Sequence, residues 1–401
     1  MNKKIMILGA SILQLPAIEK AREMGLEVVV VDMNPNAVGF DVEGVRKEVI
    51  STIDIPAVVE CAKKHNIDGV MTLASDMPMR TVAAVANELG LVGISDDTAL
   101  KATNKAVMRA ALKEGNVPIP KFFRVTNEAE YRKVVSNFQS PFVVKPADNS
   151  GSRGIYLVNN IEDCDSISAA YLHSRSFSRN GDVVVEEYMV GPEVSVETFT
   201  VNGTCHIIQI TDKITTGAPH FVEMGHTQPS QLSDETKQEI MDVARAANRA
   251  IGIMNGPSHT EIIVTEEGPK IVELGARLGG DCITTHLVPL STGVNMVEAC
   301  IKSALGEVPD INPTVSMVSA IRFFNQNSGT IKCITGIEEA EQLEGIKQIS
   351  MVHTVGEKLH AVESSSDRVG FIIVQANSLD SVLNICREAM SIINVEVEEE
   401  Q

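Results

Sequence analysis

One predicted β-hairpin in the third quarter of the chain constrains its fold and its chemistry more than any other feature. Two apolar runs, residues 262–264 and 271–272, flank residues 266–268, which predict a three-residue loop with glycine at its left-handed position. Closing that loop places Glu261 directly opposite Glu273, with Cβ atoms about 4.5–5.5 Å apart. Because like charges opposite one another destabilise a sheet, we expect a positive charge between the two carboxylates.

The same face of this hairpin carries further candidate site residues. The strand period of two puts Gly275 and Arg277 on the face of Glu273, just before Gly279 and Gly280. Mg²⁺ is typically held by one or two carboxylates together with substrate phosphates, so this face predicts a metal site. A solvated hairpin face with scattered charges is the alternative interpretation, and the choice depends on the rest of the chain.

Composition limits the classes of partner. The 401 residues suggest two or three domains, and the 44% apolar content is typical of globular proteins. A net charge of −19 argues against nucleic acid or an anionic membrane as partner, although a local basic pocket can still hold a small phosphate ligand. No stretch reaches the roughly 18 apolar residues of a membrane span. Seven cysteines without a CxxC pattern indicate a reduced, cytoplasmic protein.

The first 95 residues alternate short apolar runs with helical patterns, which predicts a parallel, doubly wound sheet. The predicted strands are 5–8, 27–31, 69–73 and 91–94, and the predicted helices are 15–24, 55–65 and 79–89. Gly9 and Asp32 follow strands as in dinucleotide-binding folds, but the GxGxxG pattern is missing. We therefore favour a structural role for this region, with an NAD-dependent oxidoreductase as the alternative.

Basic residues and small polar residues in the middle of the chain suit a phosphate ligand. Lys105 and Arg109 share one stripe of a helix predicted over 96–113, and Lys145 lies in a short apolar strand. The following loop, 147–154, is rich in glycine and serine and offers N–H groups and hydroxyls, although it is no Walker P-loop. A solvated helix face and an ordinary hairpin end are the alternatives.

Acidic residues follow at the end of a predicted buried strand. Glu186 and Glu187 end that strand, and Glu193 precedes the alternating strand 194–199. Buried carboxylates need hydrogen-bond donors, which an adenine amino group, ribose hydroxyls or backbone amides can supply. Beyond the hairpin, strands predicted at 318–324, 371–376 and 395–397 and a helix at 381–392 indicate a small α+β domain, in which we expect no catalytic constellation.

Taken in order, these features resemble the ATP-grasp superfamily. Residues 258–262 and 273–280 are most similar to the carboxylate–amine ligases that make dipeptides from L-amino acids. The resemblance implies an α/β and α+β architecture in three parts. These are a Rossmann-like preATP-grasp domain (1–98), an ATP-grasp domain (99–308) with a lid subdomain at about 122–186, and a C-terminal α+β domain (309–401).

The resemblance also implies a role for each site residue. Lys105 and Lys145 would bind ATP phosphates, the glycine-serine loop would close over them, residues 186–189 would hold the adenine and Glu193 the ribose. The implied ATP-binding residues are Lys105, Lys145, Ser150, Gly151, Ser152, Glu186, Glu187, Tyr188, Met189 and Glu193. Glu261 and Glu273 would hold Mg²⁺, or Mn²⁺ in its place. Gly275 stands where the family usually has Asn, which leaves two carboxylates and water as metal ligands, and Asn104 replaces a common Asp.

The implied reaction joins a small carboxylate to an amine through an acyl phosphate, with release of ADP and with an amino acid as one substrate. Arg277 would stabilise the anionic transition state, and His259 would orient substrate or take the amine proton, unless it is purely structural. Glu223, His226, Gly279 and Gly280 are candidate substrate contacts; an exposed loop is the alternative for the first two. A homodimer is common among similar enzymes. The competing functions are a phosphoribosylamine–glycine ligase, a carboxyphosphate-forming carboxylase and a non-catalytic nucleotide-binding protein.

Overall fold

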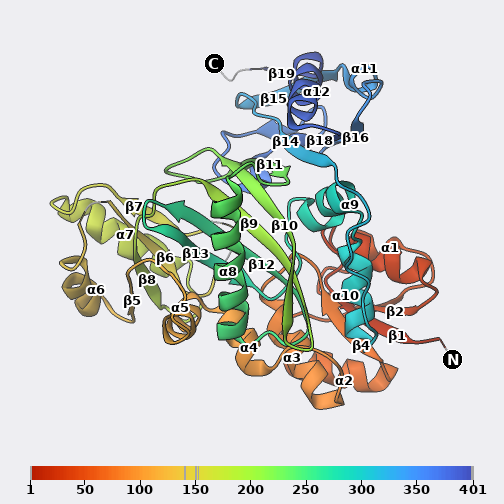
Figure 1. Cartoon of the computed structure of the whole chain (residues 1–401), viewed down its shortest axis with the longest axis horizontal. Helices are drawn as coiled ribbons and strands as arrows, with labels where there is room; N and C mark the ends of the chain where they lie inside the picture. Colours follow the sequence, from red (N-terminus) through yellow and green to blue (C-terminus); the bar gives the residue numbers. More distant parts are fainter. Residues whose placement is uncertain (1, 140, 150, 152, 399–401) are drawn as a thin grey trace.

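The structure is a computed structural model that describes residues 2–139, 141–149, 151 and 153–398. Figure 1 shows an amino-terminal α/β domain, a small lobe that contains β5–β8, a large central sheet and a carboxyl-terminal domain beyond the sheet. Among the described residues, no helix is long and apolar enough to cross a membrane. All seven cysteines are free thiols.

The amino-terminal domain is the predicted parallel sheet with one strand exchanged. Its strands run in the order β3-β2-β1-β4, where β1 is Lys4–Leu8, β2 Glu27–Asp32, β3 Arg46–Val49 and β4 Gly69–Thr72. Helices α1 (Leu15–Glu23), α2 (Ile55–His65) and α3 (Pro78–Leu89) and a 3₁₀ turn (Val38–Asp41) connect or follow these strands. The strand predicted at 91–94 is absent, because Leu91 N–H instead caps the end of α3. The edge strand β3 is mostly exposed and polar, so it has no apolar pattern by which to predict it.

The small lobe is a four-stranded antiparallel sheet covered by two helices. Its strand order is β5-β8-β6-β7, with β5 Phe122–Val125, β6 Phe142–Pro146, β7 Tyr156–Val158 and β8 Val183–Glu187. Helices α6 (Glu128–Val135) and α7 (Cys164–Ser176) pack on it around the buried rings of Tyr131, Tyr171 and Phe142. This lobe therefore has an apolar core of its own.

The central sheet has eight antiparallel strands and continues into the carboxyl-terminal domain. The strand order is β13-β12-β9-β10-β11-β14-β18-β16. The bounds are β9 Glu193–Val201, β10 Thr204–Thr215, β11 Glu223–Gln228, β12 Gly256–Thr265, β13 Gly268–Gly275, β14 Val318–Phe323, β16 Ile346–Met351 and β18 Gly370–Ala376. Helix α8 (Asp234–Ile251) lies along β9, β10, β12 and β13 (Figure 1).

The remaining elements flank this sheet. After β13 come a π-helical turn (Ile283–Leu287) and helices α9 (Val288–Thr292) and α10 (Met296–Ala304). The carboxyl-terminal domain adds the small sheet β17-β15-β19, with β15 Gly329–Thr335, β17 Lys358–Leu359 and β19 Asn394–Glu398. It also contains α11 (Ile337–Ala340), α12 (Leu379–Ile392) and a 3₁₀ turn (Ser365–Asp367). The domain limits expected at 98/99 and 308/309 stay predictions.

The helix predicted over 96–113 is two helices, α4 (Asp96–Thr103) and α5 (Lys105–Glu114). Asn104 separates them with an extended backbone (φ −134°, ψ 111°), and its side chain accepts a hydrogen bond from Val107 N–H at 3.1 Å. Asparagine favours this N-cap position because its side chain satisfies a free N–H of the first turn. Lys105 therefore begins a helix, next to the small lobe, instead of lying in the middle of one.

The hairpin is present with a turn that differs from the prediction. Thr265 pairs with Gly268, so the loop has residues 266 and 267 only and the predicted three-residue loop is wrong. A register shift between Glu261 and Ile262 then returns Glu261 to the position opposite Glu273. Because a bulge adds one residue to one strand, it compensates for the shorter turn. The expected carboxylate pair is therefore confirmed by a route that the sequence pattern does not reveal.

Candidate active site

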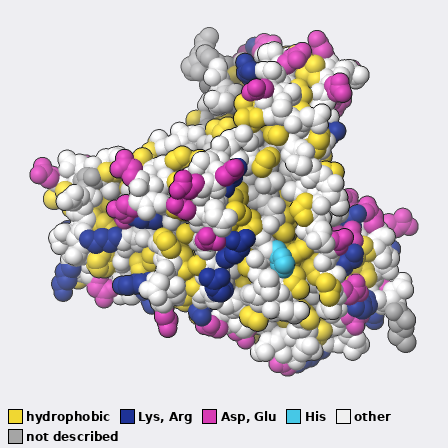
Figure 2. Space-filling model, viewed as in Figure 1, with side chains coloured by type: hydrophobic (Ala, Val, Ile, Leu, Met, Phe, Trp, Pro, Cys, Tyr) yellow, Lys and Arg dark blue, Asp and Glu magenta, His cyan; other side chains and the backbone are white. Residues whose placement is uncertain are grey.

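A cavity of about 540 Å³ lies between the central sheet, the small lobe and the amino-terminal domain. Its walls come from β6, β8, β9–β13, the loop at 74–76 and residues 364–366 of the carboxyl-terminal domain. Figure 2 shows acidic and basic side chains interspersed across the side of the molecule that carries the small lobe and α5. Gly151 and Gly280 line this cavity, whereas Ser150 and Ser152 lie outside the described residues.

The two predicted phosphate-binding lysines both reach this cavity. Lys105 Nζ donates to Glu273 Oε1 at 2.8 Å and to the carbonyl of Asn149 at 2.6 Å. Lys145 on β6 pairs with Glu186 on the neighbouring strand β8, at 2.6 Å between Nζ and Oε2. Burial lowers the pKa of Lys145. Both ammonium groups are thus held in fixed positions by protein oxygens.

Glu186 is the centre of a buried ion triad. Besides Lys145, it accepts hydrogen bonds from Arg109 Nε at 2.6 Å and Nη2 at 3.2 Å, and all three side chains are almost fully buried. Burial raises the pKa of Glu186, but the charges of Arg109 and Lys145 outweigh it and bring the pKa to about 2. The sequence places Arg109 in a basic stripe one helical turn after Lys105, and that spacing is the signal for this role. Contact between Glu186 and an adenine amino group stays a prediction.

The connector after β8 contains the other predicted adenine residues. Tyr188 and Met189 line the cavity, and the Tyr188 ring lies 6.2 Å from that of Phe221. The Glu187 N–H donates to the carbonyl of Lys121, and its carboxylate accepts from the Lys121 N–H at 3.1 Å. This connector is therefore anchored to Lys121, the residue before β5, and forms one wall of the cavity.

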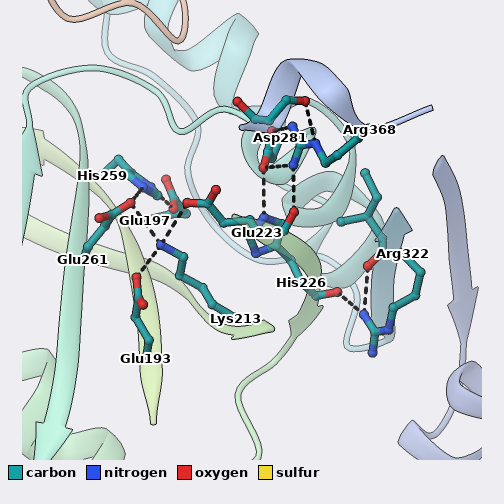
Figure 3. A network of polar contacts seen from close by, with 12 residues as sticks. Glu193, Glu197, Lys213, Glu223, His226, His259, Glu261, Asp281, Arg322 and Arg368 are labelled. Carbon is teal, nitrogen blue, oxygen red and sulfur yellow. Dashed lines mark hydrogen bonds and ion pairs between the residues drawn. The ribbon is translucent and has the colours of Figure 1, made fainter. Parts of the chain in front are cut away.

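A single buried lysine connects three of the predicted acidic site residues. Lys213 Nζ on β10 lies 2.6 Å from Glu193, 3.1 Å from Glu261 and 3.4 Å from Glu223 (Figure 3). Burial lowers the pKa of Lys213, but the three carboxylates outweigh it and raise the pKa well above its usual value. Sequence reasoning missed Lys213, although a lone lysine in a strand beside acidic strands was a usable signal.

The positive charge expected between Glu261 and Glu273 is thus divided between two lysines. Lys213 neutralises Glu261 and Lys105 neutralises Glu273. Burial raises the pKa of Glu261, but Lys213 and His259 outweigh it and hold the pKa well below its usual range. Both hairpin carboxylates line the cavity.

His259 forms a buried pair with Glu197, a residue that sequence reasoning missed. The His259 Nδ1 lies 2.6 Å from Glu197 Oε1, and Nε2 lies 3.4 Å from Glu261 Oε1 (Figure 3). Burial lowers the pKa of His259, but Glu197 outweighs it and brings the pKa to about 9. A Cβ added to Gly279 would lie 2.7 Å from Nδ1, so only glycine fits against this pair. A carboxylate inside an otherwise buried strand was the signal for Glu197.

Arg277 is fixed by an acidic residue of the amino-terminal domain. Its Nε donates to Asp76 Oδ1 at 2.8 Å and its Nη2 to Oδ2 at 3.3 Å. Burial lowers the pKa of Arg277, but Asp76 outweighs it and raises the pKa. A Cβ at position 275 would lie 3.0 Å from Asp76 Oδ1 and 3.2 Å from Arg277 Cζ. The close approach of this ion pair accounts for Gly275 at a position where the resemblance leads one to expect Asn.

The far end of the cavity is completed by the carboxyl-terminal domain. Arg368 makes two hydrogen bonds of 2.8 Å to the carboxylate of Asp281, lies 3.7 Å from the centre of the Phe323 ring and donates to the carbonyl of Glu223. His226 Nε2 lies 3.4 Å from Asp281 Oδ2. Burial raises the pKa of Asp281, but Arg368 and His226 outweigh it and hold the pKa far below its usual range. The carboxyl-terminal domain, in which we expect no catalytic constellation, thus contributes residues 364–366 to the cavity wall and Arg368 to the pair with Asp281.

Glu223 and His226 lie on the strand β11 and line the cavity. His226 is 1% exposed, and its carbonyl accepts a hydrogen bond from Arg322 Nη1 at 2.8 Å. The alternative of a solvent-exposed loop is therefore wrong for these two residues. The strand was hidden from sequence reasoning because glycine, histidine and threonine interrupt its apolar pattern.

Comparisons with known proteins agree with this geometry. Residues 138–285 match the family model for the ATP-grasp domain, and residues 18–93 match that for the ATP-grasp N-terminal domain. Residues 322–398 match the model for the L-amino acid ligase C-terminal domain 2. The chain belongs to the ATP-grasp superfamily and has the ATP-grasp fold.

Within this class the chain is close to L-amino acid ligases. It is 25% identical to the L-arginine-specific L-amino acid ligase of Bacillus subtilis, over 82% of this chain and 81% of the relative. The crystal structure of the L-amino acid ligase from Bacillus licheniformis superposes with a TM-score of 0.86 at 25% identity, covering 99% of each chain. The chain is also 27% identical to the formate-dependent phosphoribosylglycinamide formyltransferase of Saccharolobus solfataricus, over 98% of this chain and 97% of the relative.

Proposed function

We propose that this protein is an ATP-dependent carboxylate–amine ligase that joins an amino acid to a second small molecule through an acyl phosphate and releases ADP and phosphate. The observation that carries this proposal is the composition of one cavity. It combines the fixed lysines Lys105 and Lys145 at one end with the opposed carboxylates of Glu261 and Glu273 in the middle. The pair of Asp281 and His226 lies at the other end. Such a cavity suits a nucleotide triphosphate, a hard cation and a small zwitterion, respectively.

The opposed carboxylates fit Mg²⁺ by their chemistry. Glu261 and Glu273 offer only carboxylate oxygens, and both face the cavity on neighbouring strands. Mg²⁺ prefers oxygen ligands and commonly bridges one or two carboxylates to phosphates, whereas Mn²⁺ accepts the same ligands. When bound, the ion would neutralise charge on the transferred phosphoryl group. As the ion binds, Lys105 would release Glu273 and contact nucleotide oxygens. Lys213 would release Glu261 and keep its contacts with neighbouring carboxylate oxygens.

The order of groups along the cavity supports a reaction in two steps. A substrate carboxylate oxygen attacks the γ-phosphorus, the bond to the β,γ-bridging oxygen breaks, and ADP leaves. The amine nitrogen then attacks the acyl carbon, the carbon–oxygen bond to phosphate breaks, and the departing phosphate takes the proton that the amine loses. Lys105 and Lys145 would orient the phosphates, and Arg277, held by Asp76, would stabilise the tetrahedral oxyanion. His259, held by Glu197 at Nδ1, would position Glu261 through Nε2.

The far end of the cavity favours an amino acid over a phosphoribosyl substrate. Arg368 is fully engaged by Asp281, so this cation is neutralised before any substrate binds. The Glu223 carboxylate has one long contact, 3.4 Å to Lys213, and lines the cavity. A carboxylate in that position suits an ammonium group and opposes a phosphate monoester.

The test is Mg²⁺- and ATP-dependent phosphate release, screened over pairs of L-amino acids, with ADP and AMP separated. We expect ADP and phosphate only when two particular substrates are present. AMP as the product would refute the acyl-phosphate route. Turnover with phosphoribosylamine and glycine, or with bicarbonate, would replace this proposal by one of the related ATP-grasp reactions. Binding of nucleotide without turnover over all substrates would indicate a non-catalytic protein.

A further inference from the structure

Three side chains that offer sulfur, nitrogen and oxygen converge in the amino-terminal domain, outside the cavity. They are Glu48 on the edge strand β3 and Cys61 and His65 on α2. One ligand atom from each lies within 4.8 Å of the other two. None of the three lines the cavity described above or has a role in the proposed reaction.

The convergence is a consequence of local structure. Cys61 and His65 are four residues apart on α2, so both side chains leave the same face of the helix. Glu48 reaches this face from β3, and its Oε1 lies 2.6 Å from His65 Nε2. Cys61 is 5% exposed, while the side chains of His65 and Glu48 are 12% and 20% exposed. The group is thus closed on the side of the core and reachable from solvent on the other side.

We propose that Glu48, Cys61 and His65 form a binding site for a borderline-soft divalent cation of the Zn²⁺ class, with water as the fourth ligand. One thiolate, one imidazole and one carboxylate are the ligand types that Zn²⁺ takes, commonly in a tetrahedral arrangement with an open position. This donor set differs from the all-oxygen pair Glu261 and Glu273, which suits Mg²⁺. The two sites are therefore expected to select different metals.

The surroundings of the three residues are compatible with a cation. Lys64 donates to Glu48 Oε1 at 2.9 Å, but its side chain is 67% exposed, and such surface pairs contribute only about 0–1 kcal/mol. Lys64 can therefore move into solvent when a metal takes the carboxylate. His65 is the last residue of α2, where the free carbonyl groups at the helix end favour positive charge.

Co²⁺ is the probe that reports on the ligand set, because a cobalt–thiolate bond gives a charge-transfer absorption that oxygen ligands do not. The full-length protein is titrated with Co²⁺ in excess Mg²⁺, which occupies the oxygen-only site, and Zn²⁺ is then added. We expect the absorption to appear in the wild type at one equivalent and to be removed by one equivalent of Zn²⁺.

Two variants and a matched control complete the test. Cys61→Ser should abolish the charge-transfer absorption, and His65→Gln should weaken Zn²⁺ binding about tenfold or more. Cys300→Ser changes a different buried thiol, which lies on α10, and should leave the charge-transfer absorption and the Zn²⁺ affinity unchanged. Lys64→Ala should tighten binding because the competing cation is lost. No thiolate absorption in the wild type, or its persistence in a folded Cys61→Ser variant, would overturn the proposal.

Discussion

Replacing Lys213 by methionine should destabilise the protein in a way that a divalent cation reverses. The substitution keeps the length and apolar stem of the side chain but removes the ammonium group that contacts Glu193, Glu223 and Glu261. Without the ammonium group, the three neighbouring carboxylates repel one another in a partly buried region. Removing one partner of a buried ion pair typically costs about 3–5 kcal/mol.

The exposure of the three carboxylates places the loss in free energy of unfolding at the lower end of that range. The three carboxylate side chains are 24%, 25% and 23% exposed, so water offsets part of the lost attraction, and we expect about 3 kcal/mol. The entropy of unfolding is about 2.1 cal/mol/K per residue, so for 401 residues that unfold together Tm falls by about 4 °C.

The assay is thermal unfolding followed by fluorescence of an added dye, with and without Mg²⁺. Because Mg²⁺ replaces the missing positive charge in the folded state only, it should raise the Tm of Lys213→Met more than that of the wild type. Lys237→Met is the matched control, since Lys237 pairs with a fully solvated Asp234 and should be nearly neutral. A Tm of Lys213→Met equal to that of this control, or an equal response to Mg²⁺, would refute the role assigned to Lys213.

Three further predictions concern the cavity walls. Gly279→Ala should lower kcat/KM about a hundredfold, because the new methyl group displaces His259; steady-state kinetics of the folded variant measure this, and unchanged kinetics would contradict it. Asp76→Asn should lower kcat while KM for ATP stays constant, since only the orientation of Arg277 is affected. Although burial raises the pKa of Glu186, its two cationic neighbours bring the pKa to about 2. The ionised form of Glu186 therefore stabilises the fold above pH 4.5, and this contribution to stability disappears as the pH falls from about 4.5 to about 2. Unfolding of wild type and Glu186→Gln should therefore differ less at the acid end of that window.

The sequence predicts the elements that have regular apolar patterns and the residues that lie beside them. Helix α2 has the predicted bounds, Ile55–His65, because a proline and an aspartate define its start and the apolar spacing is regular. The edge strand β3 and the strand β11 were missed, since polar residues occupy most of their positions. Local patterns carry no information on strands whose stability comes from their neighbours.

In the candidate site, too, contacts within one local element can be predicted from the sequence and contacts between distant segments cannot. Glu261 and Glu273 could be paired from the hairpin alone, because both lie within one local element. Asp76 and Arg368 could not, since each reaches its partner across a large sequence separation. Asp76 and Arg277 are 201 residues apart, and Arg368 and Asp281 are 87 residues apart. Which charges neutralise one another is a property of the folded topology.

The position of the carboxyl-terminal strands in the central sheet determines when the protein becomes complete during synthesis. β14 and β18 extend the sheet beyond β11, and Arg368 closes the far end of the cavity only after β16 has been made. A nascent chain that ends after β14 but before Arg368 leaves the outer edge of β14 unpaired and Asp281 without Arg368. Such an edge invites pairing with other chains. Prematurely terminated products should therefore aggregate, although most of the residues proposed to bind the nucleotide are already present in them.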